Sequence, residues 1–247
     1  MKFLALLKQD FRNIATNPTN IFMFFIFPTM LILLLGFLFS NMYQSDLLNS
    51  YDFYGVTMIF FTAMMGSTVP ANAFMEERIK AGNVRIFYAP VSKVQVYLSK
   101  LIACFLFMGF LLSLNVVILS STGLVNFGGA NIIFVIIMLL SLIMFFTILS
   151  GAICVSVKSE EITNTILSNL MAVFGLLSGI FFPIASLGEW MDKVSNLSPL
   201  KWVLNSIFEL IYDGTSENYV LILICLSVIS LLLLLIVHRN YKPEDYI

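Results

Sequence analysis

Long apolar stretches separated by short polar connections make up most of this chain. Each stretch has about twenty residues, which as an α-helix rising about 1.5 Å per residue crosses a hydrocarbon core of roughly 30 Å. A membrane β-barrel would instead show segments of about ten residues with alternating polarity. The pattern predicts an all-α integral membrane protein with six transmembrane helices, at about 20–41, 54–75, 96–120, 131–156, 163–182 and 219–238.

Two segments outside these spans are also amphipathic. Residues 1–18 place apolar side chains on one helical face, which is typical of an interfacial helix lying on the membrane. The connection 183–218 repeats apolar residues at helical spacing and contains tryptophans, which favour the membrane interface. We expect it to return into the outer leaflet as short re-entrant helices. The apolar positions are Phe3, Leu7, Phe11 and Ile14 in the first segment, and Trp190, Val194, Trp202, Val203, Ile207 and Leu210 in the second.

Basic residues are distributed unevenly between the two sides of such a membrane protein. With the N-terminus inside, eleven of the 13 Lys and Arg residues fall in segments on the cytoplasmic side, and only Lys193 and Lys201 fall outside. Basic loops are retained on the cytoplasmic side, so both termini are predicted to be cytoplasmic. A bacterial-type plasma membrane is the expected location, with lipid as the surroundings.

Composition narrows the classes of function. The chain of 247 residues is 60% apolar and 11% charged, against roughly 25% charged in soluble domains. Its net charge of −1 gives no reason to expect a nucleic-acid partner. A single histidine excludes a two-histidine catalytic or metal site within one chain. The spans lack the embedded carboxylates that proton- or sodium-coupled carriers use, which argues against a secondary transporter.

The connection after the second span combines charged and apolar residues in a pattern that suits docking to a soluble partner. Apolar side chains recur at approximate helical spacing, charged residues flank them, and a proline ends the helix. A basic loop that only contacts lipid headgroups is the alternative. The candidate coupling residues are Glu76, Glu77, Arg78, Gly82, Phe87, Tyr88 and Pro90, within a coupling helix region at 76–92.

These residues and a second motif resemble those of the ABC-2-type exporter permeases. The first motif is Glu76-Glu77-Arg78, Gly82, Pro90-Val91-Ser92 and Lys100. The second, after the fifth span, is Gly179-Ile-Phe-Phe-Pro183, Leu187-Gly188-Glu189-Trp190 and Leu197-Ser198-Pro199-Leu200. The resemblance extends over essentially the whole chain, which it makes a single transmembrane domain, 1–247.

The resemblance implies two permeases around one path, each docked on a cytoplasmic ATP-binding subunit. The second copy could be identical or a related chain. Pro183, Trp190, Pro199 and Trp202 would belong to an external segment that covers the exit. The chain contains no phosphate-binding loop of the G-x-x-x-x-G-K-[ST] type, so we expect no cofactor on this chain, with ATP and Mg²⁺ on the partner subunit.

The fifth predicted span has a stripe of small and polar residues. Asn164, Ser168, Ala172, Gly175 and Gly179 recur at spacings of four, four, three and four. Small residues let helix backbones approach closely in lipid, where the hydrophobic effect does not drive helix association. The stripe predicts a packing face within the subunit, a seam between two copies or a lining of the path.

The sequence thus predicts the permease subunit of an ATP-driven exporter for a hydrophobic or amphipathic substrate, such as a drug, peptide or lipid. The chain itself is not expected to be an enzyme. The alternative is an accessory or immunity membrane protein without transport activity of its own. Dependence of transport on a partner ATPase separates the two.

Overall fold

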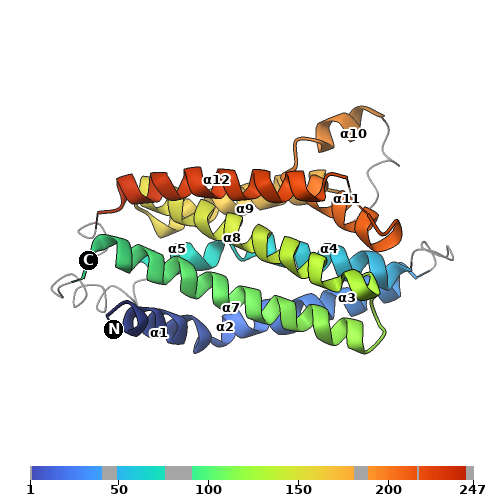
Figure 1. Ribbon diagram of the computed structural model, residues 1–247, viewed down its shortest axis with the longest axis horizontal. Coiled ribbons are helices and arrows are strands. Elements are labelled where there is room, and N and C mark those ends of the chain that lie inside the picture. The colour runs from blue at the N-terminus through green and yellow to red at the C-terminus, as the bar shows by residue number, and fades with distance from the viewer. Residues whose placement is uncertain (1, 41–48, 76–90, 181–188, 216, 243–247) are drawn as a thin grey trace.

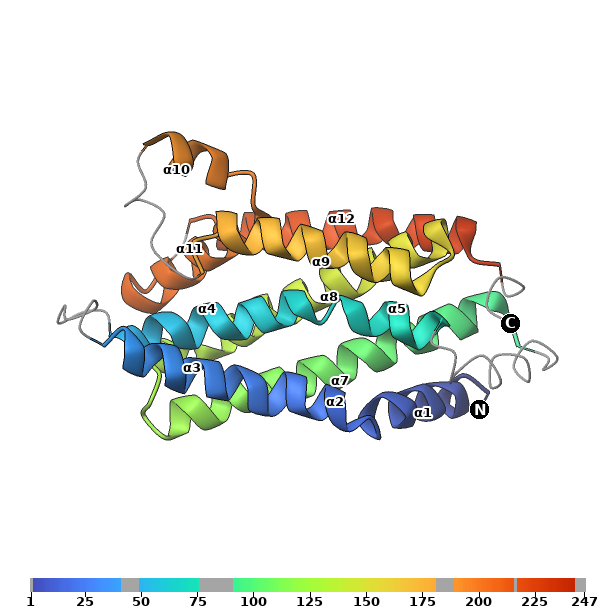
Figure 2. The ribbon, with the colours of Figure 1, turned by 180° about the vertical axis from the view of Figure 1, so that it is seen from behind.

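The structure is an elongated bundle whose long helices run along a common direction (Figure 1). This computed structural model describes residues 2–40, 49–75, 91–180, 189–215 and 217–242, and within them every regular element is a helix. The first helix begins and the last helix ends at one end of the bundle, called here the terminal end (Figures 1 and 2). The opposite end is called the far end.

Five helical stretches are long and apolar enough to cross a membrane. They confirm five of the six predicted spans, with ends that differ by at most four residues. The fifth predicted span, 163–182, corresponds to α9 (Glu160–Leu177), which has only 18 residues and begins with two glutamates. Its crossing stays a prediction. The five stretches are Pro18–Leu38, Ser50–Met75, Lys93–Ser121, Gly129–Val157 and Tyr219–Asn240.

The first span contains a π-helical turn whose cause is visible in the sequence. Pro28 has no N–H, so the carbonyl oxygen of Phe24 four residues earlier lacks its usual helical donor. Asn115 of α7 supplies one, donating from Nδ2 to that oxygen at 2.9 Å, and Thr29 donates to Asn115 Oδ1 at 2.8 Å. The span consists of α2 (Pro18–Ile21), η1 (Phe22–Ile26) and α3 (Phe27–Leu38).

The second span is interrupted as well, between α4 (Ser50–Met65) and α5 (Thr68–Met75). Pro70 cannot donate to the carbonyl oxygen of Gly66, and Val69 donates to it instead at 3.1 Å, in a tighter turn. A Cβ at Gly66 would lie 2.6 Å from Met108 Sδ and 3.0 Å from Phe24 Cε1, so only glycine fits without displacing them. The turn therefore packs tightly against the first and third spans.

The second span also forms the centre of the core. Its middle turns contain Met58, Ile59, Phe60, Ala63 and Met64, all with no exposed surface. α8 contacts α4, α5, α7, α9 and α12, so it closes the other side of this core. The remaining elements are α7 (Lys93–Ser121), η2 (Gly129–Asn131), α8 (Ile132–Val157), α10 (Glu189–Ser195), α11 (Pro199–Tyr212) and α12 (Tyr219–Asn240).

The N-terminal amphipathic segment forms α1 (Lys2–Ala15), which packs along α7 at the terminal end (Figure 2). Ile14 is buried as predicted, but Phe11 is 37% exposed and Asp10 lies on the buried face. Phe3 and Leu7 are half-buried, so the predicted face is correct at three of its four positions, and Asp10 takes the place of Phe11 where α1 packs against α7. Its location at the membrane surface stays a prediction.

Candidate functional site

The residues predicted to couple the chain to an ATP-binding subunit lie outside the described residues, but both flanks of their segment are described. α5 ends at Met75 and α7 begins at Lys93, both at the terminal end (Figure 1). Ser92 Oγ accepts from the backbone N–H of Gln95 at 3.4 Å, and Gln95 Oε1 accepts from that of Ser92 at 3.3 Å. This capping box fixes where α7 begins. The residues concerned are Glu76, Glu77, Arg78, Gly82, Phe87, Tyr88 and Pro90.

A buried cluster of charged and polar groups lies between these flanks and α1. Asp10 is 6% exposed and Lys100 is 2% exposed. Lys100 Nζ lies 3.5 Å from Asp10 Oδ1 and donates to the carbonyl oxygen of Ala73 at 2.9 Å. Ser99 Oγ donates to Asp10 Oδ2 at 2.5 Å. The cluster therefore connects α1, α5 and α7.

The partners of this cluster offset the cost of burying two charges. Removing a carboxylate or an ammonium from water costs several kcal/mol per ion, and mutual attraction compensates only when the other polar atoms are also hydrogen-bonded. Both oxygens of Asp10 have a partner here, and Lys100 has a second acceptor in Ala73. Ala73 lies in the last turn of α5, whose carbonyls lack helical donors and favour a nearby cation.

Sequence reasoning missed this cluster, although a signal for it exists. Asp10 follows Leu7 by three residues and precedes Ile14 by four, so all three share one helical face. An acidic residue in the middle of an apolar face needs a cationic partner once that face packs. Lys100 belongs to the first sequence motif and to the cytoplasmic basic residues, but neither pattern indicates Asp10 as its partner.

The residues of the predicted small-residue stripe do not share one face of α9. Some are buried, some are exposed, and Gly179 lies in the turn after the helix. Gly175 is buried, where a Cβ would lie 3.1 Å from Phe61 Cε2 of α4. Asn164 is half-buried, and its side-chain amide hydrogen-bonds that of Asn72 of α5 at 2.9 Å. Ser168 and Ala172 are exposed. Gly179 follows the end of α9 with φ of +76°, so it is not part of the helical packing face.

Within the subunit, the stripe is therefore not the main packing face of α9, and its use as a seam or a path lining stays a prediction. The buried face of α9 is formed by Thr163, Leu167, Met171 and Gly175, one position away from most of the predicted residues. Gly179 occupies the left-handed position that commonly ends a helix, where glycine is favoured. The apparent G-x-x-x-G match therefore combines one packing glycine with one terminating glycine.

The exposed face of α9 is unusual for a helix in a membrane protein. Thr165, Ser168 and Asn169 are exposed there beside Ala172. The exposed face of α12, by contrast, consists of large apolar residues that suit contact with lipid tails. The mixed face of α9 suits a protein neighbour or a water-accessible path better than lipid. The exposed apolar residues of α12 include Val220, Leu221, Ile224, Val228, Leu231, Leu232 and Leu235.

The predicted external segment lies at the far end, where α10 and α11 connect α9 to α12 (Figure 1). Pro199 is in the first turn of α11, and Ser198 before it donates to the carbonyl oxygen of Phe174 in α9 at 3.0 Å. Trp190 is 73% and Trp202 51% exposed, and Trp202 donates to the carbonyl oxygen of Asn196 at 2.8 Å. Two helices form in this segment, while their entry into the outer leaflet stays a prediction. Pro183 lies outside the described residues.

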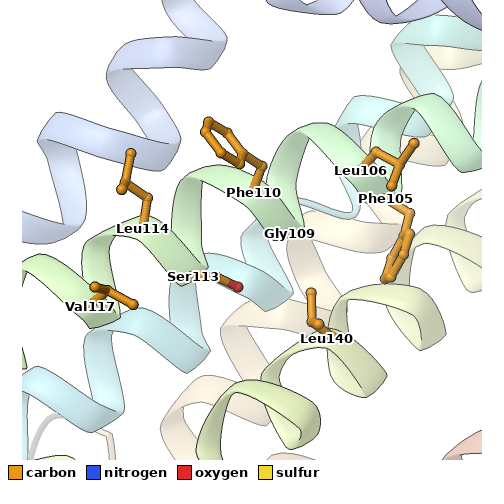
Figure 3. Close-up of a pocket in the computed structure, with 8 residues that line it drawn as sticks. All are labelled: Phe105, Leu106, Gly109, Phe110, Ser113, Leu114, Val117 and Leu140. Atoms are coloured by element: carbon orange, nitrogen blue, oxygen red, sulfur yellow. The ribbon is translucent and has the colours of Figure 1, made fainter. Parts of the chain in front are cut away.

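An apolar groove of about 430 Å³ lies between α7 and α8 (Figure 3). Gly109 opens it, since a Cβ there would lie 2.8 Å from Leu140 Cδ2. Phe110 at its rim is 65% exposed, so the groove lies on the outer surface rather than inside the bundle. Nothing in its lining distinguishes it from a lipid-facing surface. Its lining residues are Phe105, Leu106, Gly109, Phe110, Ser113, Leu114, Val117 and Leu140.

Among the described residues, no group of three or more His, Cys, Asp and Glu side chains is placed to hold a metal ion. The arrangement of long apolar helices with a buried ionic cluster at one end defines the class of multi-pass α-helical membrane proteins. The family model described as ABC-2 type transporter matches residues 1–212. The chain belongs to this family and is the membrane component of an ABC-type transport system. No curated protein that was compared matches the chain.

Proposed function

We propose that the chain is the permease subunit of an ATP-driven exporter, with ATP and Mg²⁺ bound by a separate cytoplasmic subunit. The family match over residues 1–212 carries this proposal. The positions of the chain ends support it, because both flanks of the segment 76–92 lie at the same end of the bundle as α1 and the end of α12 (Figure 2). A soluble subunit could therefore dock at a single face.

Purification of the tagged chain from its native membrane tests this proposal. We expect an ATP-binding subunit to co-purify, and its recovery to be lost when residues 76–91 are scrambled. The readouts are mass spectrometry and ATP hydrolysis by the purified complex. A control variant with the exposed residues Ser121 and Thr122 both replaced by alanine changes the far end and should retain the partner. A well-folded chain that recovers no ATPase would instead support an accessory or immunity protein.

The terminal end is proposed to face the cytoplasm. Eight described basic residues lie at this end and two lie at the far end, a difference that the retention of basic loops on the cytoplasmic side explains. The eight are Lys2, Lys8, Arg12, Lys93, Lys100, Lys158, Arg239 and Lys242, and the two are Lys193 and Lys201.

Thiol labelling of intact cells measures this orientation. In a chain whose three native cysteines are replaced by alanine, Thr122→Cys at the far end should react with a membrane-impermeant reagent. Glu161→Cys at the start of α9 should react only after the membrane is permeabilised. Both positions are exposed, so accessibility depends on the side of the membrane. The reverse labelling pattern would overturn the proposed orientation.

Two copies are proposed to meet along the exposed face of α9. Its hydroxyl and amide groups are poorly suited to lipid, whereas small residues such as Ser168 and Ala172 allow close approach of a second helix. Polar groups lining this seam alongside Val173 and Leu176 would suit a hydrophobic or amphipathic substrate. Transport of a fluorescent lipid, compared with that of a hydrophilic sugar in proteoliposomes, tests this substrate class.

Disulfide cross-linking tests the seam. Ala172→Cys, in the cysteine-free chain, should form a disulfide-linked dimer on mild oxidation in the membrane. Phe110→Cys is the matched control, because it is also exposed but lies on α7 at the rim of the apolar groove. We expect the control to stay monomeric. Equal cross-linking of both variants, or none at Ala172→Cys, would contradict a homodimer seam on α9.

A further inference from the structure

We propose that Asp10 and Lys100 are positioning residues that hold the end of α5 in a fixed position on α1, so that movement at the segment 76–92 reaches α1. This inference rests on the proposed function, because it concerns how the docked ATP-binding subunit acts on the helices. It gives a partner to Lys100, which the first sequence motif contains, and a role to Asp10, which no sequence motif identified.

Lys100 connects the two flanks of the segment 76–92. Its Nζ binds the carbonyl oxygen of Ala73, three residues before Glu76, and its own backbone lies in the third turn of α7, eight residues after Ser92. The same ammonium group contacts Asp10 of α1. Displacement of either flank therefore changes the position of the charge that Asp10 faces.

A buried ion pair transmits movement between helices better than an apolar contact would. α1 and the first span already have apolar contacts with α7, including the Phe11–Phe107 and Phe24–Phe107 ring pairs with centroids 6.1 and 6.3 Å apart. Such contacts tolerate sliding, whereas hydrogen bonds fix distance and direction. A buried ion pair also adds little stability compared with apolar residues of similar volume, so its presence indicates a role in specifying geometry.

Low exposure makes the connection insensitive to solvent. With Lys100 2% exposed and Asp10 6% exposed, water and salt can replace neither partner while the helices stay packed. Ser99 occupies the second oxygen of Asp10, so the carboxylate cannot rotate away without losing a hydrogen bond. The cluster thus transmits a displacement between α1, α5 and α7 instead of absorbing it.

The test uses the complete transporter, purified with its ATP-binding subunit and reconstituted in liposomes. Four forms are compared: the unaltered chain, Asp10→Leu/Lys100→Met, Lys100→Arg, and Lys8→Met as a control on the exposed face of α1. Transported substrate per ATP hydrolysed is the main readout, with subunit recovery and melting temperature measured alongside. We expect the double variant to keep its partner and fold but to lose about tenfold in transport per ATP. Lys100→Arg and Lys8→Met should stay within about twofold of the unaltered chain.

Two results would overturn the inference. The double variant could transport as much per ATP as the unaltered chain, which would leave the cluster a purely structural role while the proposed function stands. The unaltered complex could show no ATP-dependent transport, which would end the proposed function and this inference together. If the double variant does not fold, Asp10→Asn/Lys100→Gln replaces it, since the shorter neutral amide at position 100 cannot bridge residue 10 and the carbonyl oxygen of Ala73. The same tenfold loss is expected, and unchanged coupling in a folded protein would again overturn the inference.

Discussion

Replacing Lys100 by methionine is expected to lower the free energy of unfolding by about 3–5 kcal/mol, the range for breaking a buried ion pair by removing one partner. The carboxylate of Asp10 would remain between α1 and α7 with Ser99 but no cation. The carbonyl oxygen of Ala73 would lose its donor as well. Unfolding of the purified chain in mixed detergent micelles, followed by loss of helical circular dichroism, measures the effect.

The matched control removes both charges. In Asp10→Leu/Lys100→Met the unpaired carboxylate is gone, and an apolar pair of similar volume often costs little or even stabilises. We therefore expect the double variant to recover most of the lost stability. The explanation would be wrong if the double variant were less stable than Lys100→Met alone. A loss below about 1 kcal/mol in the single variant, typical of solvent-exposed pairs, would equally contradict burial of the cluster.

Replacing Asn115 by leucine is expected to cost about 1–3 kcal/mol, the penalty for leaving a buried polar group without its partner. Asn115 is 2% exposed and lies six residues before the end of α7, where lipid and protein supply no replacement donor for the carbonyl oxygen of Phe24. Thr29 keeps a second acceptor in the carbonyl oxygen of Phe25 at 3.1 Å, so the penalty comes mainly from Phe24. Detergent unfolding measures this loss too.

Combining Asn115→Leu with Pro28→Ala tests whether Asn115 stabilises the chain by supplying the donor that Pro28 cannot supply to Phe24. An alanine at position 28 restores the backbone N–H that Phe24 lacks, so Asn115→Leu should cost less there than in the unaltered chain. We expect the two substitutions to be non-additive by about 1 kcal/mol, within the range for residues that share a hydrogen-bond network. Strictly additive effects would mean that Asn115 stabilises the chain by another route.

The spans were largely predictable because their cause is local. A run of about twenty apolar residues must be helical in lipid, where every backbone group needs an internal partner. Three of the five stretches begin after a side chain that caps the helix, such as Ser92 with Gln95 before α7. The prediction was less accurate for α9, which begins three residues before the predicted span and ends at Leu177, five residues before the predicted end, because Gly179 adopts a left-handed conformation just beyond it.

The cluster of Asp10 and Lys100 was not predicted, because it depends on which helices become neighbours. These residues lie ninety positions apart, and neither is unusual by itself. The same holds for Asn115, which completes the hydrogen bonding of the first span from a distant helix. Pairings between distant helices follow from packing, which span length and charge distribution do not determine.

The two interrupted spans are not independent of one another. The side chain of Met108 and the ring of Phe24, on the π-helical turn of the first span, together occupy the space left by the missing side chain of Gly66 at the break in the second span. The irregular turns of the two spans therefore pack against each other. The first span can straighten only if the second makes room for it, so a change of shape in one membrane helix requires a change in the other.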